Sequence, residues 1–266
     1  MKLTVIKATL VVAFLVLTVW LTLLGLNNKE AKIDFKALEK ERSTAMNTQN
    51  EASFDNLLKN IGNSTTLVKP DILVSTDTSR LSLSIELLDS NKQYVYAGVL
   101  SEKLANIQHS EWRYFMAARY FLMETYSHVN PENELMFIKR SKKNLEKTLE
   151  INPHNLNAKT DLAICFYNIN KMQGVENETD QMKPIQLLLQ VTEENPSHID
   201  AQYYLAKLGI ESGQLEKAIE RFKKLVSLQP QNQEFYLELS KIYEMQGNTK
   251  EAKEWADKAR NLNNLK

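Results

Sequence analysis

Cysteine, glycine and proline are all scarce in this sequence, and its charges cancel. Cys165 is the only cysteine, which excludes an internal disulfide, a CxxC pair and a thiolate zinc cluster. Only 7 glycines and 6 prolines occur in 266 residues, a balance that favours long helices over turn-rich β structure. The 33 basic and 33 acidic residues create no overall field that would attract nucleic acid. The composition therefore predicts a folded, largely helical protein that does not bind nucleic acid.

Motifs of catalysis and cofactor binding are also missing. The chain has no P-loop, GxSxG, HExxH or dinucleotide-binding glycine pattern. Its histidines are widely separated, and His154 and His198, which follow helix-ending prolines, are interpreted as turn residues rather than metal ligands. Cys165 is interpreted as a small buried residue of a helix. We expect no catalytic residue, no metal site and no cofactor, and hence a protein that is not an enzyme.

The one long hydrophobic run lies at the N-terminus. Residues 8–26 carry no charge, and as a helix they would span about 28 Å, close to the hydrocarbon thickness of a bilayer. Two lysines precede the run, as in a signal peptide, but Leu23 and Gly25 make a poor small-x-small cleavage site. We therefore predict an uncleaved single-span anchor over residues 1–28, in preference to a removed signal peptide or a buried core helix.

The side of the membrane on which the body lies is a separate question. Five basic residues between positions 29 and 42 outnumber the two before the run, which by itself favours a cytoplasmic body. The signal-like layout favours the opposite side, and long domains translocate with little regard for charge. We predict an extracytoplasmic body on a bacterial inner membrane, with the cytoplasmic arrangement as the open alternative.

Between the anchor and the body, residues 29–79 are predicted to form a polar helix or stalk followed by a linker. The part up to residue 61 has weak helical periodicity. Residues 62–79 are rich in Ser and Thr with one Pro, which is typical of a linker. The folded body is then expected to occupy residues 80–266.

The body contains a repeated pattern. Pro196 and Pro230 lie 34 residues apart, and each closes a stretch with apolar helical periodicity. Before Pro230, residues of defined size follow in a fixed order, namely Leu205, Ala206, Gly213, Ala218 and Phe222. The same order returns in the next segment with Tyr236, Leu239, Ser240, Tyr243, Gly247, Ala252, Ala256 and Ala259. This order resembles the tetratricopeptide repeat, a helical hairpin whose small residues let two helices pack closely and whose glycine ends the first helix.

Looser copies of the pattern precede these two repeats. One pair covers residues 157–196 with an insertion near 168–183, and another covers 111–153 with an insertion near 128–137. Residues 81–107 have helical periodicity but lack the turn glycine and the final proline. We predict an all-α fold, an antiparallel helix-hairpin solenoid of four to five repeats preceded by one transmembrane helix and the polar stalk.

The resemblance implies a concave groove lined by the first helix of each hairpin. In the family, positions two, five, nine and twelve of that helix face the groove. In this sequence those positions give the predicted partner-binding residues Asn157, Thr160, Ile164, Tyr167, Asp200, Tyr203, Lys207, Ile210, Glu234, Leu237, Lys241 and Glu244. Inter-helix packing is an equal alternative for Tyr167 and Tyr203, and a solvated surface role is the alternative for Lys207 and Lys241. The asparagines of the family's carboxylate clamp are not reproduced.

Taken together, the sequence predicts a membrane-anchored scaffold or assembly factor that binds a peptide or helix of a protein partner, resembling bacterial envelope repeat proteins. The alternative is a structural, noncatalytic subunit of a multiprotein membrane complex. The sequence stops directly after the last repeat, so Trp255 and Leu262 are expected to be exposed and to support docking of a partner or self-association.

Overall fold

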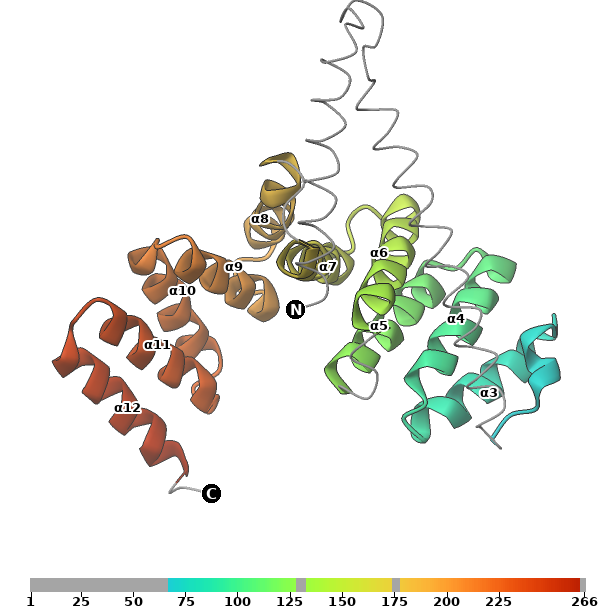
Figure 1. Cartoon of the computed structure of the whole chain (residues 1–266), viewed down its shortest axis with the longest axis horizontal. Helices are drawn as coiled ribbons and strands as arrows, with labels where there is room; N and C mark the ends of the chain where they lie inside the picture. The colour runs from blue at the N-terminus through green and yellow to red at the C-terminus, as the bar shows by residue number, and fades with distance from the viewer. Residues whose placement is uncertain (1–66, 128–132, 174–177, 264–266) are drawn as a thin grey trace, which may run out of the picture. The chain divides into compact units, whose positions relative to one another are not determined.

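The computed structural model describes residues 67–127, 133–173 and 178–263, and this part of the chain is entirely helical (Figure 1). A short 3-10 helix, η1 (Pro70–Leu73), precedes the first hairpin. The α-helices then pair in chain order as α3 (Thr78–Ser90) with α4 (Tyr94–Gln108), α5 (Glu111–Ser127) with α6 (Glu134–Ile151), α7 (Leu156–Gln173) with α8 (Glu178–Glu194), α9 (Ile199–Glu211) with α10 (Leu215–Leu228), and α11 (Gln233–Met245) with α12 (Thr249–Asn263). The predicted all-α hairpin fold is confirmed for these residues.

Stacking of successive hairpins builds the core. Each second helix contacts the first helix of the next hairpin as well as its own partner, so every hairpin is covered by its neighbours. The core is therefore divided into clusters that lie along the chain rather than gathered at one centre. Ala206 and Ala218 are fully buried in the same cluster, as expected for small residues where two helix axes approach.

Two glycines end the first helices of the last two hairpins. Gly213 and Gly247 have φ of 74° and 77°, in the left-handed region that favours glycine. The next N–H reaches back to a carbonyl five residues earlier, at 2.8 Å from Gln214 to Gly209 and at 2.8 Å from Asn248 to Tyr243. These bonds are those of a Schellman cap, which satisfies carbonyls left free at the helix end.

The first hairpin makes the same turn without a glycine. Lys92 follows α3 with φ of 58°, and the N–H of Gln93 donates to the Leu88 carbonyl at 2.8 Å. No glycine marks this turn in the sequence, and lysine rarely adopts this conformation. The turn nevertheless keeps the Schellman bonds of the glycine-containing repeats.

The insertions near residues 128–137 and 168–183 are accommodated largely by longer helices. α7 continues to Gln173 and α8 begins at Glu178, whereas the first helices of the last two hairpins have only 13 residues each. Residues 128–132 and 174–177 lie outside the described part of the chain.

The predicted linker over residues 62–79 is wrong for its second half. Ile72 of η1 is buried and packs in the same cluster as Leu81 and Leu100. Lys103 of α4 donates to the Leu73 carbonyl at 2.6 Å, which holds η1 against the first hairpin. Burial of the apolar Ile72 side chain favours packing of this segment on the first hairpin, although the residues around it are mostly polar.

No described helix combines the length and apolarity needed to cross a bilayer. The predicted anchor at residues 1–28 and the stalk up to residue 66 lie outside the described residues.

The turn at Lys92 yields a stability prediction. Lys92→Gly removes a side chain from a left-handed position, and we expect the free energy of unfolding to rise by about 0.5–1 kcal/mol. The reverse change Gly213→Lys is expected to lower it by about 1 kcal/mol, because a Cβ at Gly213 meets no atom within 4 Å and only the backbone conformation is affected. Urea unfolding of both variants measures this, and destabilisation by Lys92→Gly would contradict it.

Candidate functional site

Two first helices that belong to different hairpins come close to each other. Tyr126, at the end of α5, and Tyr204, in α9, interact electrostatically. Helix α7 lies between them in the chain and contacts α9, and its Asp161 acts electrostatically on both tyrosines. The first helices α5, α7 and α9 therefore share one surface. We call this surface the inner face and define it by Arg119, Tyr126, Asp161, Tyr167, Asp200, Tyr203 and Tyr204.

Four tyrosines of the inner face form one cluster, here called the tyrosine cluster: Tyr126, Tyr167, Tyr203 and Tyr204. The ring of Tyr204 lies 6.2 Å from that of Tyr167 at 68°, and 5.4 Å from that of Tyr203 at 86°. These are edge-to-face contacts, which the aromatic quadrupole favours. Burial is the main cause that raises the pKa of Tyr167, Tyr203 and Tyr204, so each of these hydroxyls keeps its proton at neutral pH.

Two of these hydroxyls connect neighbouring hairpins. Tyr203 of α9 donates to Glu234 Oε1 of α11 at 2.7 Å. Tyr167 of α7 donates to Glu211 at the end of α9. A neutral phenol supplies a hydrogen bond to each carboxylate but no positive charge beside it.

Asp161 is the most perturbed acid of the inner face. Its Oδ2 atom is buried and has no hydrogen-bond partner among the described residues. The pKa of Asp161 is raised to about 6, mainly by burial; Arg119 of α5 opposes the rise and the charge of Asp200 adds to it. Asp161 therefore stays ionised at neutral pH but is poorly compensated.

Two predicted groove residues of α7 are wrong as surface residues. Thr160 is buried, and its hydroxyl donates to the Leu156 carbonyl at 2.8 Å. Ile164 is also buried. Asp161, one position after Thr160, interacts electrostatically with Tyr126 of α5 and Tyr204 of α9. Asn157 of the same helix is exposed and lies 3.1 Å from the His198 ring nitrogen.

The other predicted groove residues keep some exposure. Tyr203 is half-buried because its ring also packs on Phe222 and Phe235 at 6.0 and 6.2 Å, so the packing alternative holds alongside a surface role. Tyr167, Lys207 and Ile210 are half-buried, and Asp200, Glu234, Leu237, Lys241 and Glu244 are exposed.

The two predicted groove lysines share one carboxylate. Glu238 of α11 is buried and lies 3.8 Å from the Lys207 ammonium and 3.0 Å from the Lys241 ammonium. Sequence reasoning missed Glu238 because its position in the repeat is not a groove position. Both lysines therefore lie beside one carboxylate, while the Lys241 side chain is also exposed to solvent.

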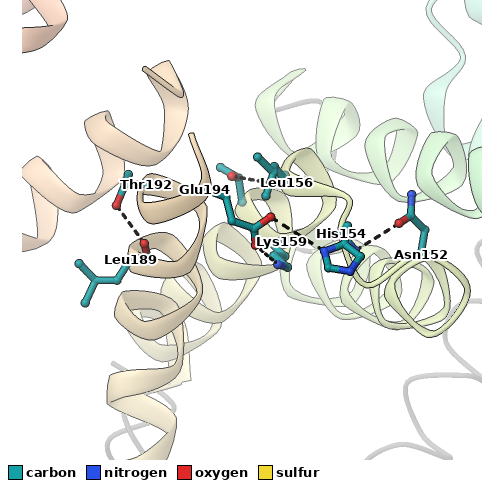
Figure 2. Close-up of polar contacts among 8 residues, drawn as sticks. Asn152, His154, Leu156, Lys159, Leu189, Thr192 and Glu194 are labelled. Atoms are coloured by element: carbon teal, nitrogen blue, oxygen red, sulfur yellow. Dashed lines mark hydrogen bonds and ion pairs between the residues drawn. The ribbon is translucent and has the colours of Figure 1, made fainter. Parts of the chain in front are cut away.

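The remaining residues singled out from the sequence have structural surroundings. Cys165 is fully buried, as expected, and burial raises its pKa to about 12. His198 caps α9 by accepting the Ala201 N–H at 3.3 Å. Figure 2 shows Glu194 of α8 between Lys159, at 2.8 Å, and His154, at 4.0 Å. Among the described residues, no group of three or more His, Cys, Asp or Glu side chains is placed to hold a metal ion.

The expected exposure of Trp255 and Leu262 is wrong. Both side chains are half-buried. Trp255 packs 5.9 Å from Tyr236 and lies under the Lys258 ammonium at 4.1 Å, because α12 folds back over α11. These two side chains therefore do not form the exposed apolar surface from which self-association was predicted.

Comparison with known proteins agrees with this geometry. A family model described as "Tetratricopeptide repeat" matches residues 209–264, which contain the end of α9, all of α10 and the last hairpin. This part of the chain matches the tetratricopeptide repeat. A curated relative from Bombyx mori, "Inactive peptidyl-prolyl cis-trans isomerase shutdown", is 32% identical over 89 residues, covering 34% of this chain and 19% of that protein. The chain thus spans about a fifth of the length of that relative.

Solved tetratricopeptide-like structures cover more of the chain. "MamA 41-end from Desulfovibrio magneticus RS-1" matches with a TM-score of 0.57 and 16% identity, over 72% of this chain and 98% of that one. A crystal structure of MamA matches with a TM-score of 0.54 and 17% identity, over 68% and 95%. At such identities the likeness shows the fold alone.

The raised pKa of Asp161 predicts a pH-dependent stability. Its folded pKa of about 6 exceeds the ordinary 3.8, so the neutral carboxyl favours the fold below about pH 4 and this contribution is lost as pH rises through 6. We expect Asp161→Asn to raise the free energy of unfolding by about 1–2 kcal/mol at pH 7.5 and to leave it nearly unchanged at pH 4.

Thermal melts at both pH values measure this effect. Glu254→Gln, at an exposed position of α12, serves as the control and should shift neither melt. An Asp161→Asn protein that is destabilised at pH 7.5 would contradict the assigned cause.

Proposed function

We propose that this chain is a membrane-anchored scaffold or assembly factor whose inner face binds a peptide or helix of a protein partner. The observation that carries the proposal is the chain of tyrosine contacts between first helices: Tyr204 of α9 packs on Tyr167 of α7, Tyr167 bonds Glu211 of α9, and Tyr203 of α9 bonds Glu234 of α11. A surface built from several repeats is long enough to contact an extended segment at successive points.

The aromatic content of this surface supports a role in binding. On α5, Trp112, Arg119 and Tyr126 recur every seven residues, so they follow one another along one face of the helix. Trp112 is 59% exposed and Tyr126 is 57% exposed. Large exposed aromatic side chains and arginine are the residues that most often anchor protein interfaces.

The membrane part of the proposal rests on residues 8–26. That segment is uncharged and long enough to cross a bilayer as a helix. An anchored body on the extracytoplasmic side of a bacterial inner membrane would present the inner face to partners at a fixed distance from the bilayer. The alternative is that the chain is a permanent structural subunit of a larger membrane complex.

Site-specific photocrosslinking tests the proposal. The full chain carries p-benzoylphenylalanine at Tyr126, or at the exposed Glu220 of α10 as the matched control, and is irradiated in intact cells. We expect one discrete protein adduct at position 126 and none at 220, in the membrane fraction. Deletion of residues 8–26 should release the chain to the soluble fraction.

The outcomes separate the parts of the proposal. An equal pattern of adducts at both positions, or none at position 126, would reject the inner face as the binding surface. A deletion variant that remains in the membrane fraction would reject the anchor. Extraction in mild detergent as one fixed large particle, rather than a separable chain, would favour the structural-subunit alternative over a scaffold.

A further inference from the structure

A groove lies between α4 and α6, the second helices of the first two hairpins. It has a volume of about 370 Å³ and is lined by Val99, Glu102, Lys103, Asn106, Ile107 and Arg140. The Arg140 Nε atom donates to Glu102 Oε2 at 2.8 Å, so an ion pair joins the two helices. Both side chains of this pair are largely buried, which makes it a fixed part of the groove.

Two ammonium groups beside this ion pair have neutral hydrogen-bond partners. The Lys103 ammonium donates to the Leu73 carbonyl at 2.6 Å, and the Lys147 ammonium of α6 donates to Asn106 Oδ1 at 2.9 Å. A carbonyl or amide oxygen accepts a hydrogen bond but carries no formal charge that offsets an ammonium. Each ammonium also has three N–H donors, so these contacts do not exhaust them.

The acids that these contacts place near the groove compensate little of this charge. Glu102 is paired with Arg140, and both carboxylate oxygens of Asp71 in η1 accept from Arg80 at 2.9 Å. The third acid, Glu150, lies in the last turn of α6. Two ammonium groups therefore stand against one carboxylate that is not engaged by either ion pair, and the groove is complementary to a negatively charged ligand.

The walls of the groove suit a side chain that is both acidic and partly apolar. Val99 and Ile107 supply apolar surface, and Ile107 is 41% exposed. Asn106 Oδ1 accepts from both Tyr114 and Lys147, so the amide N–H₂ is the group that Asn106 can offer to a ligand. Lys103 and Asn106 lie three residues apart on one face of α4, where both can donate to the same carboxylate.

We propose that the groove between α4 and α6 binds an acidic segment of a protein partner. A glutamate carboxylate of that segment accepts hydrogen bonds from Lys103 and Asn106 beside Lys147, and its methylene groups contact Val99 and Ile107. A protein segment fits the groove better than a lipid surface does, because a single side chain can enter a recess that a flat bilayer covers. The groove belongs to second helices, so this inference goes beyond the proposed function and does not depend on the inner face.

Peptide selection with the full chain in detergent tests the inference. A random peptide library is panned against the parent chain after counterselection on Ile107→Glu, which places a negative charge at an exposed position of the groove and removes peptides that bind elsewhere. We expect glutamate to recur at one position of the selected peptides. Replacing it by glutamine should weaken binding at least about tenfold in fluorescence anisotropy.

Variants of the protein complete the test. Ile107→Glu should weaken the glutamate peptide at least about tenfold, whereas Ile107→Gln, the matched neutral change, should weaken it less than about twofold. Lys103→Gln should weaken the glutamate peptide about tenfold and the glutamine peptide hardly at all. Lys253→Gln, at an exposed position of α12, is the charge control and should leave both affinities unchanged.

Thermal melts accompany the binding measurements, because Lys103 also holds η1 against the first hairpin. The two Ile107 variants leave that contact in place, so they decide the question if Lys103→Gln lowers the melting temperature.

The contrary outcomes are specific. Selected peptides without a shared acid, glutamate and glutamine peptides of equal affinity, or equal binding by the two Ile107 variants would overturn the site. Displacement of the peptide by glycerol 1-phosphate but not by glutarate would assign the groove to a phosphate headgroup and also overturn it. None of these measurements involves Tyr126, so the inner face as a binding surface stands or falls separately with its own crosslinking result.

Discussion

A helical hairpin of this length cannot bury both faces of its helices, and this constraint governs the whole described structure. Within a hairpin, alanines such as Ala206 and Ala218 let the two helix axes approach. Each hairpin then completes its core only by stacking on the next. Bulkier side chains, among them Phe222 and Phe235, then fill the space between hairpins. The same stacking brings the first helices side by side, so the inner face is a direct product of how the core is closed.

The inner face carries polar links in addition to apolar packing. Tyr167 and Tyr203 each donate to a glutamate of the following hairpin, and Tyr126 reaches Tyr204 across α7. Such bonds hold the spacing of neighbouring hairpins while leaving rings and carboxylates partly exposed. A surface whose hairpins are held at a set spacing loses little conformational entropy when it binds a partner.

The repeat pattern predicted the fold well where local signals were present. Gly213, Gly247 and the two spaced prolines marked hairpins that the structure contains. The first hairpin gave a weak signal because Lys92 takes the left-handed turn position, and Ile72 was missed because a single apolar residue in a polar segment has no periodicity.

The site was harder to predict than the fold. Family positions selected Thr160 and Ile164, which are buried, and passed over Asp161, Tyr126 and Tyr204. A repeat pattern describes residues within one hairpin. It does not encode the proximity of α5 and α9, because their residues lie far apart in the sequence. The spacing of Trp112, Arg119 and Tyr126 was the available signal for α5.

The claim that α5 and α9 meet on one inner face can be measured directly by a double-mutant cycle. The free energies of unfolding of Tyr126→Phe, Tyr204→Phe and the double variant are compared with that of the parent chain. The account predicts a coupling energy of about 0.5–1 kcal/mol between the two hydroxyls. Strictly additive effects of the two substitutions would contradict it.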